Sequence, residues 1–362
     1  MNIKTTVSLL LSIAISALAL YLAFRNVPLK DLVTYLGSIN TLWIIPTVLV
    51  VLLGFALRAL RWKIILSSTQ KIGFWSTYHP MMIGFMINCI LPGRIGEVAR
   101  PVILKKKEGV PFTAGLATVA TERVFDAGLL IAFFAVVLVC VDIDPSISLK
   151  FGQYTLNRET LMAIGTGLFR LCLVGIGGII VISVDASRNL LIRFIERFPA
   201  YLIFLKQRHR DLITDKLCRF IVKIINNFAD GFSMVKSPFK LAACTGLSLI
   251  IWILGAVSYY LMALGCPGLD ISFIELSAVM IIVCFFIALP SVPGFWGIWE
   301  AGGVFAMALF GVPAREAAGF TLANHAVQMF PVIIAGLYSA VLTGVKIRQF
   351  AGAKMEITND AT

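Results

Sequence analysis

Long apolar stretches dominate this sequence and are separated by short polar segments. Six of the stretches are long enough to cross about 30 Å of hydrocarbon as helices. They lie at residues 6–24, 41–58, 112–140, 160–184, 239–264 and 319–345. We expect each to form a transmembrane helix. The first is included because its apolar part is longer than that of a usual secretory signal.

Two further apolar segments, 80–104 and 273–311, are interrupted by proline and glycine. The interrupting residues are Pro92, Gly93 and Gly96 in the first segment and Pro293, Gly294 and Gly297 in the second. A continuous helix is not compatible with such clusters. Irregular backbone is tolerated at membrane depth only where protein or a polar cavity surrounds it. We therefore predict two broken, re-entrant helical hairpins.

The composition sets the class of protein. Of the 362 residues, 59% are Ala, Val, Ile, Leu, Met, Phe, Trp, Tyr or Cys, and only 14% are charged, against about 25% charged in soluble domains. This excludes a soluble enzyme, a disordered tail and a disulfide scaffold. The seven cysteines show no CxxC or Cys/His ligand spacing, so we interpret them as core residues rather than metal or redox sites. The sequence predicts an all-α polytopic membrane protein.

The charge is unequally distributed, with 31 Lys+Arg against 19 Asp+Glu and a net charge of +12. Both nucleic-acid binding and the positive-inside bias of membrane proteins produce such an excess. If the N-terminus is cytoplasmic and each hairpin returns to the side that it enters, the basic clusters all fall on the inner side. They lie at 58–71, 105–107, 185–240 and 346–354. We therefore expect a cytoplasmic (inner) membrane protein with both termini inside and no nucleic-acid partner.

The two interrupted segments belong to a repeat. Gly109-Val110-Pro111 follows the first and Gly311-Val312-Pro313 follows the second. Eleven and twelve residues after each proline stand Glu122-Arg123 in the first copy and Asn324-His325 in the second. Three full spans separate equivalent points, so the second copy is predicted to be inverted relative to the first, as in alternating-access transporters.

The predicted organisation has five parts. They are an N-terminal helix and outer loop (1–40), a first repeat (41–140) with hairpin 80–104, a fourth span with cytoplasmic amphipathic helices (141–238), a second repeat (239–345) with hairpin 273–311, and a cytoplasmic tail (346–362). Within the third part, residues 185–240 hold eleven Lys+Arg against five Asp+Glu. Their alternation with apolar residues is typical of helices that lie on anionic inner-leaflet lipids. A docking site for a partner protein is the alternative.

Charged residues gather at the first interruption and in the span after it. Arg94, Glu97 and Arg100 recur at helical spacing from the break, and a helix N-terminus with two guanidinium groups on one face suits phosphate. Glu122, Arg123 and Asp126 lie inside an apolar span, where an unpaired charge costs at least about 2.5 kcal/mol. One arginine between two acids leaves an acid that Arg94, Arg100 or a cationic substrate must neutralise.

The charged residues allow alternative interpretations. The first group is either a headgroup-binding site or a buried salt-bridge network that fixes helix packing. In the second copy, Glu300 and His325 are candidates for carrying a proton or a cation, or for a hydrogen-bonded packing contact. We expect Arg58 and Arg61 to anchor the inner end of the second span to lipid phosphate.

Three motifs carry a resemblance to a known family. They are Pro92-Gly93-Arg94-x-Gly96-Glu97-x-x-Arg100-Pro101, Glu122-Arg123-x-x-Asp126 and Pro293-Gly294-x-x-Gly297-x-x-Glu300. Across roughly residues 10–345 the sequence resembles the lysylphosphatidylglycerol synthase transmembrane-region family, the flippase-like half of the bifunctional lysylphosphatidylglycerol synthase/flippase. The resemblance implies an inner-membrane lipid translocator with two re-entrant elements.

The sequence departs from that family at two points. It shows no soluble aminoacyl-transferase domain after residue 345, so we do not expect synthase activity or necessarily an aminoacylated lipid. His325 stands where the family often has an arginine, which leaves the headgroup charge and the energy coupling open.

Two functions from different classes follow. The first is a flippase-like transporter that moves a phospholipid or lipid-linked headgroup, anionic or zwitterionic, through a cavity at the repeat interface. Arg94, Arg100 and Arg123 would then hold phosphate, and the acids would balance them or hold an ammonium group. The alternative is a membrane transferase or phosphatase acting on a polyprenyl or phospholipid substrate, and a lipid-binding scaffold is a third candidate.

The sequence predicts few further components. It has no P-loop, so we expect no direct use of ATP. We assign no catalytic residue, no cofactor and no metal site. A homo-oligomer or a partner enzyme is compatible with the sequence.

Overall fold

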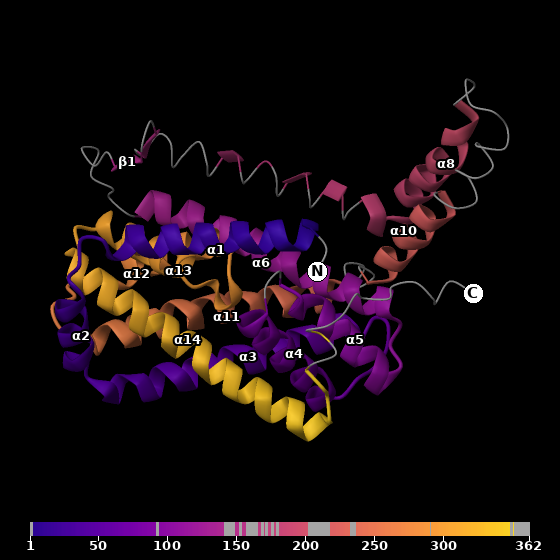
Figure 1. Cartoon of the computed structure of the whole chain (residues 1–362). Coiled ribbons are helices and arrows are strands. Elements are labelled where there is room, and N and C mark those ends of the chain that lie inside the picture. Colours follow the sequence, from indigo (N-terminus) through magenta and orange to yellow (C-terminus); the bar gives the residue numbers. More distant parts are fainter. Residues whose placement is uncertain are drawn as a thin grey trace.

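The computed structural model describes residues 3–91, 94–140, 181–201, 218–231, 237–289 and 291–347, with residue 350 and short pieces between 149 and 178. Nearly all of the described part is helical, as the composition predicts (Figure 1). The described exception is a small antiparallel hairpin in a loop, formed by β1 (Leu149–Phe151) and β2 (Tyr154–Leu156). The protein is thus an all-helical membrane protein.

Three helical segments are long and apolar enough to cross a membrane. They are α3 (Ile44–Leu66) with the short 3-10 turn η1 (Thr41–Trp43) before it, α11 (Pro238–Leu264) and α14 (Ala314–Thr343). Each coincides with a predicted span. A fourth candidate is formed by α1 (Ile3–Phe24) and α2 (Leu29–Ser38), which meet at a bend of 77° that the hydropathy pattern does not predict.

The remaining predicted spans have different outcomes. Residues 112–140 form one helix, α6 (Phe112–Cys140), as expected. Most of 160–184 lies outside the described residues. The structure therefore supports three to four candidate spans among the described residues, and the larger number of six stays a prediction.

Both interrupted segments are helical hairpins. The first consists of α4 (Phe74–Ile90) and α5 (Gly96–Glu108), and the second of α12 (Phe273–Phe286), the 3-10 turn η4 (Pro293–Phe295) and α13 (Ile298–Ala308). In each, the two arms pack against one another. The first hairpin runs from residue 74 to residue 108 and is therefore longer than the predicted 80–104. Its first arm begins directly after Gly73, before the start of the predicted segment.

Glycines set how closely the arms approach. A methyl group on Gly96 would lie 1.8 Å from the carbonyl oxygen of Gly84 on the opposite arm, and one on Gly302 would lie 2.8 Å from the Phe286 side chain. Only glycine fits such contacts. Gly96, at the first break, and Gly302, inside α13, therefore allow the two arms of each hairpin to pack closely.

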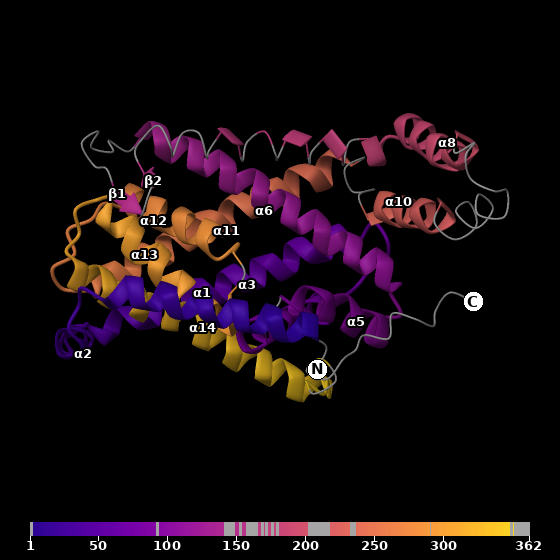
Figure 2. The same cartoon turned by 45° about the horizontal axis from the view of Figure 1, so that its top comes forward.

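The two hairpins occupy opposite ends of the bundle and their tips meet. α12 and α13 lie near α2, whereas α5 lies at the end from which α8 (Asp185–Tyr201) and α10 (Arg219–Gly231) project (Figures 1 and 2). Arg94 Nη2 of the first tip donates a hydrogen bond to the carbonyl oxygen of Ile287 in the second, at 2.6 Å. This contact joins the two hairpins at their tips, and the inverted relation between the two copies stays a prediction.

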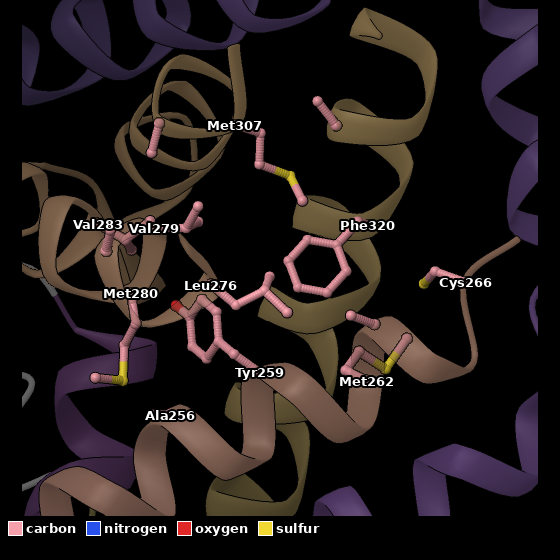
Figure 3. Packing of buried hydrophobic residues seen from close by; sticks show 14 of the residues in the cluster. Ala256, Tyr259, Met262, Cys266, Leu276, Val279, Met280, Val283, Met307 and Phe320 are labelled. Atoms are coloured by element: carbon pink, nitrogen blue, oxygen red, sulfur yellow. The ribbon is translucent and has the colours of Figure 1, made fainter. Parts of the chain in front are cut away.

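Two apolar clusters hold this arrangement. The larger one joins α2, α6, α11, α12, α13 and α14, and Figure 3 shows Tyr259, Met307 and Phe320 packed together within it. The other holds the first hairpin against α3 and α6 through residues that include Trp62, Met81 and Val119. The arms of the hairpins are therefore packed parts of the bundle.

Candidate functional site

A network of charged side chains lies where α3, α5 and α6 meet. Its centre is buried: Arg100 Nη2 donates to Glu122 Oε2 at 2.5 Å, and Arg61 Nη2 lies 3.7 Å from Glu122 Oε1. The three side chains are 2% exposed or less. The Arg100 guanidinium also lies 4.1 Å from the ring centroid of Trp62, a cation–π contact that favours the charged form.

The outer part of the network is looser and more exposed. Arg61 Nη1 donates to Asp126 Oδ1 at 2.7 Å, but the other ion pairs are 3.5 to 3.8 Å long. These longer pairs join Asp126 to Arg58 and Arg123, and Arg123 to Glu97. Arg123 is 37% exposed and Glu97 27%. The network thus runs from tightly bonded, buried charges to weakly paired, accessible ones.

The network has more cations than anions. Four arginines (Arg58, Arg61, Arg100, Arg123) face three acids (Glu97, Glu122, Asp126). Several buried guanidinium nitrogens have no hydrogen-bond partner: Arg61 Nε and Nη2, Arg100 Nε and Arg123 Nε. Buried donors without acceptors are costly, and one buried acceptor, Asp126 Oδ2, also has no hydrogen-bond partner.

Two sequence expectations about arginines are wrong. Arg61 is fully buried in the network and Arg58 pairs with Asp126, so neither matches the expected interfacial anchor. Both side chains lie on the face of α3 that packs against α6, and the buried acidic residues of α6 require a positive charge there. Arg58 and Arg61 are one helical turn apart and therefore share a face of the helix, and this spacing is the sequence feature that could have predicted their common pairing.

Arg94 also departs from its expected position. It precedes α5 with a left-handed backbone (φ 52°), so it does not continue the helical stripe of Glu97 and Arg100. Its guanidinium instead faces the second hairpin, where it bonds Ile287 and lies 5.7 Å from the Phe295 ring. Pro92 and Gly93, the predicted break residues before it, lie outside the described residues.

The predicted residues of the second copy come together around His325. His325 Nδ1 lies 2.6 Å from Glu300 Oε1, and Nε2 lies 2.8 Å from the carbonyl oxygen of Gly294. The backbone N–H of Gly297 donates to Glu300 Oε2 at 2.6 Å. Glu300 and His325 are 0% and 1% exposed. The sequence indicates Glu300 and His325 together as candidates, but it does not predict their contacts with the backbone of Gly294 and Gly297.

Local sequence explains this geometry. Gly294 and Gly297 both have positive φ, of 72° and 89°, and a methyl group on Gly297 would lie 2.2 Å from the Ser16 carbonyl oxygen of α1. The turn of Pro293–Phe295 therefore requires its glycines. Two tryptophan rings enclose the histidine: the ring centroid of Trp299 lies 4.5 Å and that of Trp296 4.4 Å from the His325 ring.

The two breaks share a backbone feature. Arg94 and Phe295 are the non-glycine residues with positive φ among those described, at 52° and 62°. Each follows a Pro-Gly pair, and they stand about 200 residues apart, the offset of the predicted repeat. The same left-handed conformation therefore occurs at both breaks.

The described residues contain no group of three or more His, Cys, Asp or Glu side chains placed to hold a metal ion.

Comparison with known proteins identifies the family. The family model described as "Lysylphosphatidylglycerol synthase TM region" matches residues 9–336. The chain belongs to this family. The sequence-based resemblance is thereby confirmed over nearly the whole length.

Two curated relatives match almost all of this family member. The protein named glycosyltransferase AglD of Haloferax volcanii is 25% identical over 96% of the chain, which spans 56% of that relative's length. The UPF0104 membrane protein MJ1595 of Methanocaldococcus jannaschii is 24% identical, with 94% of the chain and 96% of the relative covered. No solved structure gives a significant match.

Proposed function

We propose that this protein moves a phosphate-bearing lipid headgroup between the two leaflets of the cytoplasmic membrane, with the acyl chains left in the bilayer. The observation that carries the proposal is the charged network of α3, α5 and α6. It has one more cation than anions, buried N–H donors without partners, and an accessible outer part. A phosphodiester supplies the missing charge and the missing acceptors.

The different lengths of the ion pairs suggest how a headgroup enters. The outer pairs of Arg58 and Arg123 exceed hydrogen-bond length, so phosphate oxygens can replace the carboxylates there without breaking a hydrogen bond. Glu97 and Asp126 are then free to accept from a headgroup ammonium. This arrangement suits a zwitterionic lipid and also a simple anionic one.

The arrangement of the hairpins suits transport. They extend from opposite ends of the bundle and their tips meet (Figures 1 and 2). Broken helices that meet near the midplane are the elements by which transporters with inverted repeats bind substrate and alternate access. We propose that the headgroup passes through a cavity formed between the two hairpins.

Lipid movement in proteoliposomes tests this function. Fluorescent NBD-phosphatidylglycerol in the inner leaflet becomes accessible to dithionite only after translocation. Arg123→Gln should lower the translocation rate by about tenfold or more, because a hydrogen bond to a charged group contributes about 1.5 to 3 kcal/mol. Lys30→Gln, an exposed cation of α2, is the control. Equal rates for Arg123→Gln and the control would contradict the proposal.

A membrane enzyme acting on a lipid-linked substrate is the second candidate. It is favoured by one observation, the glycosyltransferase name of the Haloferax relative. The chain spans only 56% of that protein, so the activity does not carry over by similarity alone. Formation of a glycosylated product from labelled polyprenyl phosphate by the purified protein would support this candidate over transport.

We further propose that α8 and α10 lie on the anionic surface of the membrane. Leu190, Phe194 and Phe198 form an exposed apolar stripe along α8, at a spacing of four residues. Arg193 and Arg197 are exposed beside that stripe. Both helices project from the bundle (Figure 2). Aromatic residues flanked by arginine are typical of helices that insert shallowly among anionic lipids.

A further inference from the structure

The hydrogen-bond partners of His325 determine how many protons the pair of His325 and Glu300 holds. The Gly294 carbonyl oxygen, 2.8 Å from Nε2, only accepts, so Nε2 carries a hydrogen. Glu300 Oε1 lies 2.6 Å from Nδ1, and Glu300 Oε2 accepts from the Gly297 N–H. One proton must therefore lie between Nδ1 and Oε1, whether it resides on the imidazole or on the carboxyl group.

Other protonation states do not fit this geometry. If the shared proton leaves, the lone pairs of Nδ1 and Oε1 face one another at 2.6 Å. The other imidazole tautomer moves the same conflict to the Gly294 carbonyl oxygen. A second proton on Glu300 Oε2 would meet the Gly297 N–H. The closed arrangement thus binds one proton, and its loss breaks at least one contact.

The contact lies at a mechanically important place. It joins α14 to the tip of the second hairpin, whose Val292 N–H donates to Ser16 Oγ of α1 at 3.2 Å. The first hairpin reaches the same tip through Arg94. A change in the relative position of the two hairpins must therefore alter the surroundings of Glu300 and His325.

The corresponding contact of the first repeat cannot titrate in this way. There Arg123, which corresponds to His325, pairs with Glu97 at 3.8 Å, and a guanidinium stays protonated. The two copies have thus diverged: the first presents fixed cations to an anion, and the second presents a histidine that gains or loses a proton.

We propose that Glu300 and His325 form a proton-binding site that fastens the tip of the second hairpin to α14, and that release of this proton is coupled to movement of the lipid. The coupling, but not the proton binding, rests on the proposed transport function. Binding of the proton favours the closed tip, and its loss favours the open one.

Other charged groups on the surrounding elements have partners of their own. Arg94 is the cation with contacts at the tip, through Ile287 and the Phe295 ring. Arg315 at the start of α14 lies over the Tyr35 ring of α2. Arg61 of α3 bonds Asp126, and His79 of α4 bonds Ser339. These contacts leave Glu300 as the ion-pair partner of His325 in the described part of the chain.

Proton binding is tested in the wild-type protein. The chain has three histidines, so solid-state NMR of ¹⁵N-histidine protein in liposomes resolves their rings, and His325→Asn assigns the signal. The ¹³C chemical shift of the Glu300 carboxyl group shows whether that group is protonated, which completes the count of protons on the pair. We expect imidazolium with carboxylate or imidazole with carboxylic acid at neutral pH. Neutral imidazole beside an ionised Glu300 in the wild-type protein would overturn the proposal.

Coupling is tested with NBD-phosphatidylglycerol in proteoliposomes under an imposed pH difference. If one proton accompanies each lipid, the final distribution of the lipid shifts by about tenfold per pH unit. Glu300→Gln should remove this dependence, because the amide donates to Nδ1 and keeps the tip closed without a proton. Glu316→Gln, at the start of α14, should retain it.

The outcomes separate this inference from the proposed function. A wild-type lipid distribution that ignores the pH difference would overturn the coupling while leaving lipid transport intact. Retention of the pH dependence in Glu300→Gln would also overturn it. Absence of any lipid movement, with one shared proton found by NMR, would contradict the transport function and the coupling but support the proton-binding site.

Discussion

Glu122 holds two buried cations in place. It bonds Arg100 and lies 3.7 Å from Arg61, and all three side chains are nearly inaccessible. A carboxylate in such a position balances charges that the surrounding apolar helices cannot solvate. Its role at the centre of the network is therefore structural, whereas Arg123 and Glu97 lie at the more exposed edge of the network.

Glu122→Gln should consequently destabilise the protein strongly. Breaking one side of a buried ion pair typically costs about 3 to 5 kcal/mol, because the remaining charge is left unpaired. We expect a clear fall in the melting temperature of the purified protein in detergent. Glu97→Gln, whose carboxylate is 27% exposed, is the matched control and should have little effect.

A double variant checks the cause. In Glu122→Gln with Arg100→Met, one of the two stranded cations is removed, so part of the lost stability should return. If the double variant is no more stable than the single one, buried charge is not the reason for the destabilisation.

Sequence patterns indicated most residues of this charged network but not how they pair. The cost of charge in an apolar span pointed to Glu122, Arg123 and Asp126. Arg61 was missed because its pairing depends on the face that α3 turns toward α6, which hydropathy does not encode. Arg94 was misplaced because a left-handed residue before a helix changes the direction of its side chain.

At the scale of elements, the glycine crossing of α4 and α5 fixes the first hairpin. Gly96→Ala would place a methyl group 1.8 Å from the Gly84 carbonyl oxygen. The arms must separate, so we expect a lower melting temperature and loss of lipid movement. Gly54→Ala on α3, where a methyl group meets no atom within 4 Å, should be neutral or slightly stabilising. Equal melting temperatures for the two variants would show that the crossing is less tight than described.

The projecting helix α8 offers a second test at this scale. Phe194→Trp places a fluorophore on the exposed stripe, and Glu196→Trp places one on the polar side as a control. In liposomes containing phosphatidylglycerol brominated on its acyl chains, the fluorescence added by the Phe194→Trp residue should be quenched and that of Glu196→Trp much less. Similar quenching at both positions would contradict the proposed orientation on the membrane.

Apolar run length predicted several elements correctly. It placed α3, α6, α11 and α14, and proline with glycine predicted both hairpins. The 77° bend between α1 and α2 was not predicted, because the first apolar run ends at residue 24 and the residues after it, up to residue 40, were expected to form an outer loop. The short helix α2 carries Lys30 and Asp31, and hydropathy alone does not indicate a helix there.

At the scale of the whole molecule, basic residues mark one end of the bundle. Lys240 Nζ, near the start of α11, lies 3.2 Å from Ser68 Oγ after α3, and α5 ends in Lys105, Lys106 and Lys107. At the other end, the Asn40 N–H donates to the Gly265 carbonyl oxygen. By the positive-inside rule we expect the lysine-rich end to be the cytoplasmic one.

The inverted repeat then makes a prediction about two turns of identical sequence. Gly109-Val110-Pro111 leads from α5 into α6, and Gly311-Val312-Pro313 leads from α13 into α14. Because the hairpins occupy opposite ends of the bundle (Figure 1), the two turns should lie on opposite sides of the membrane. An epitope tag inserted at the second turn should react with antibody on intact spheroplasts, whereas a tag at the first should react only after permeabilisation. The tag at the first turn also serves as the control for membrane integrity. Reaction of both tags on intact spheroplasts, with a cytoplasmic marker still protected, would place the hairpins on one side and exclude the inverted arrangement on which the proposed transport depends.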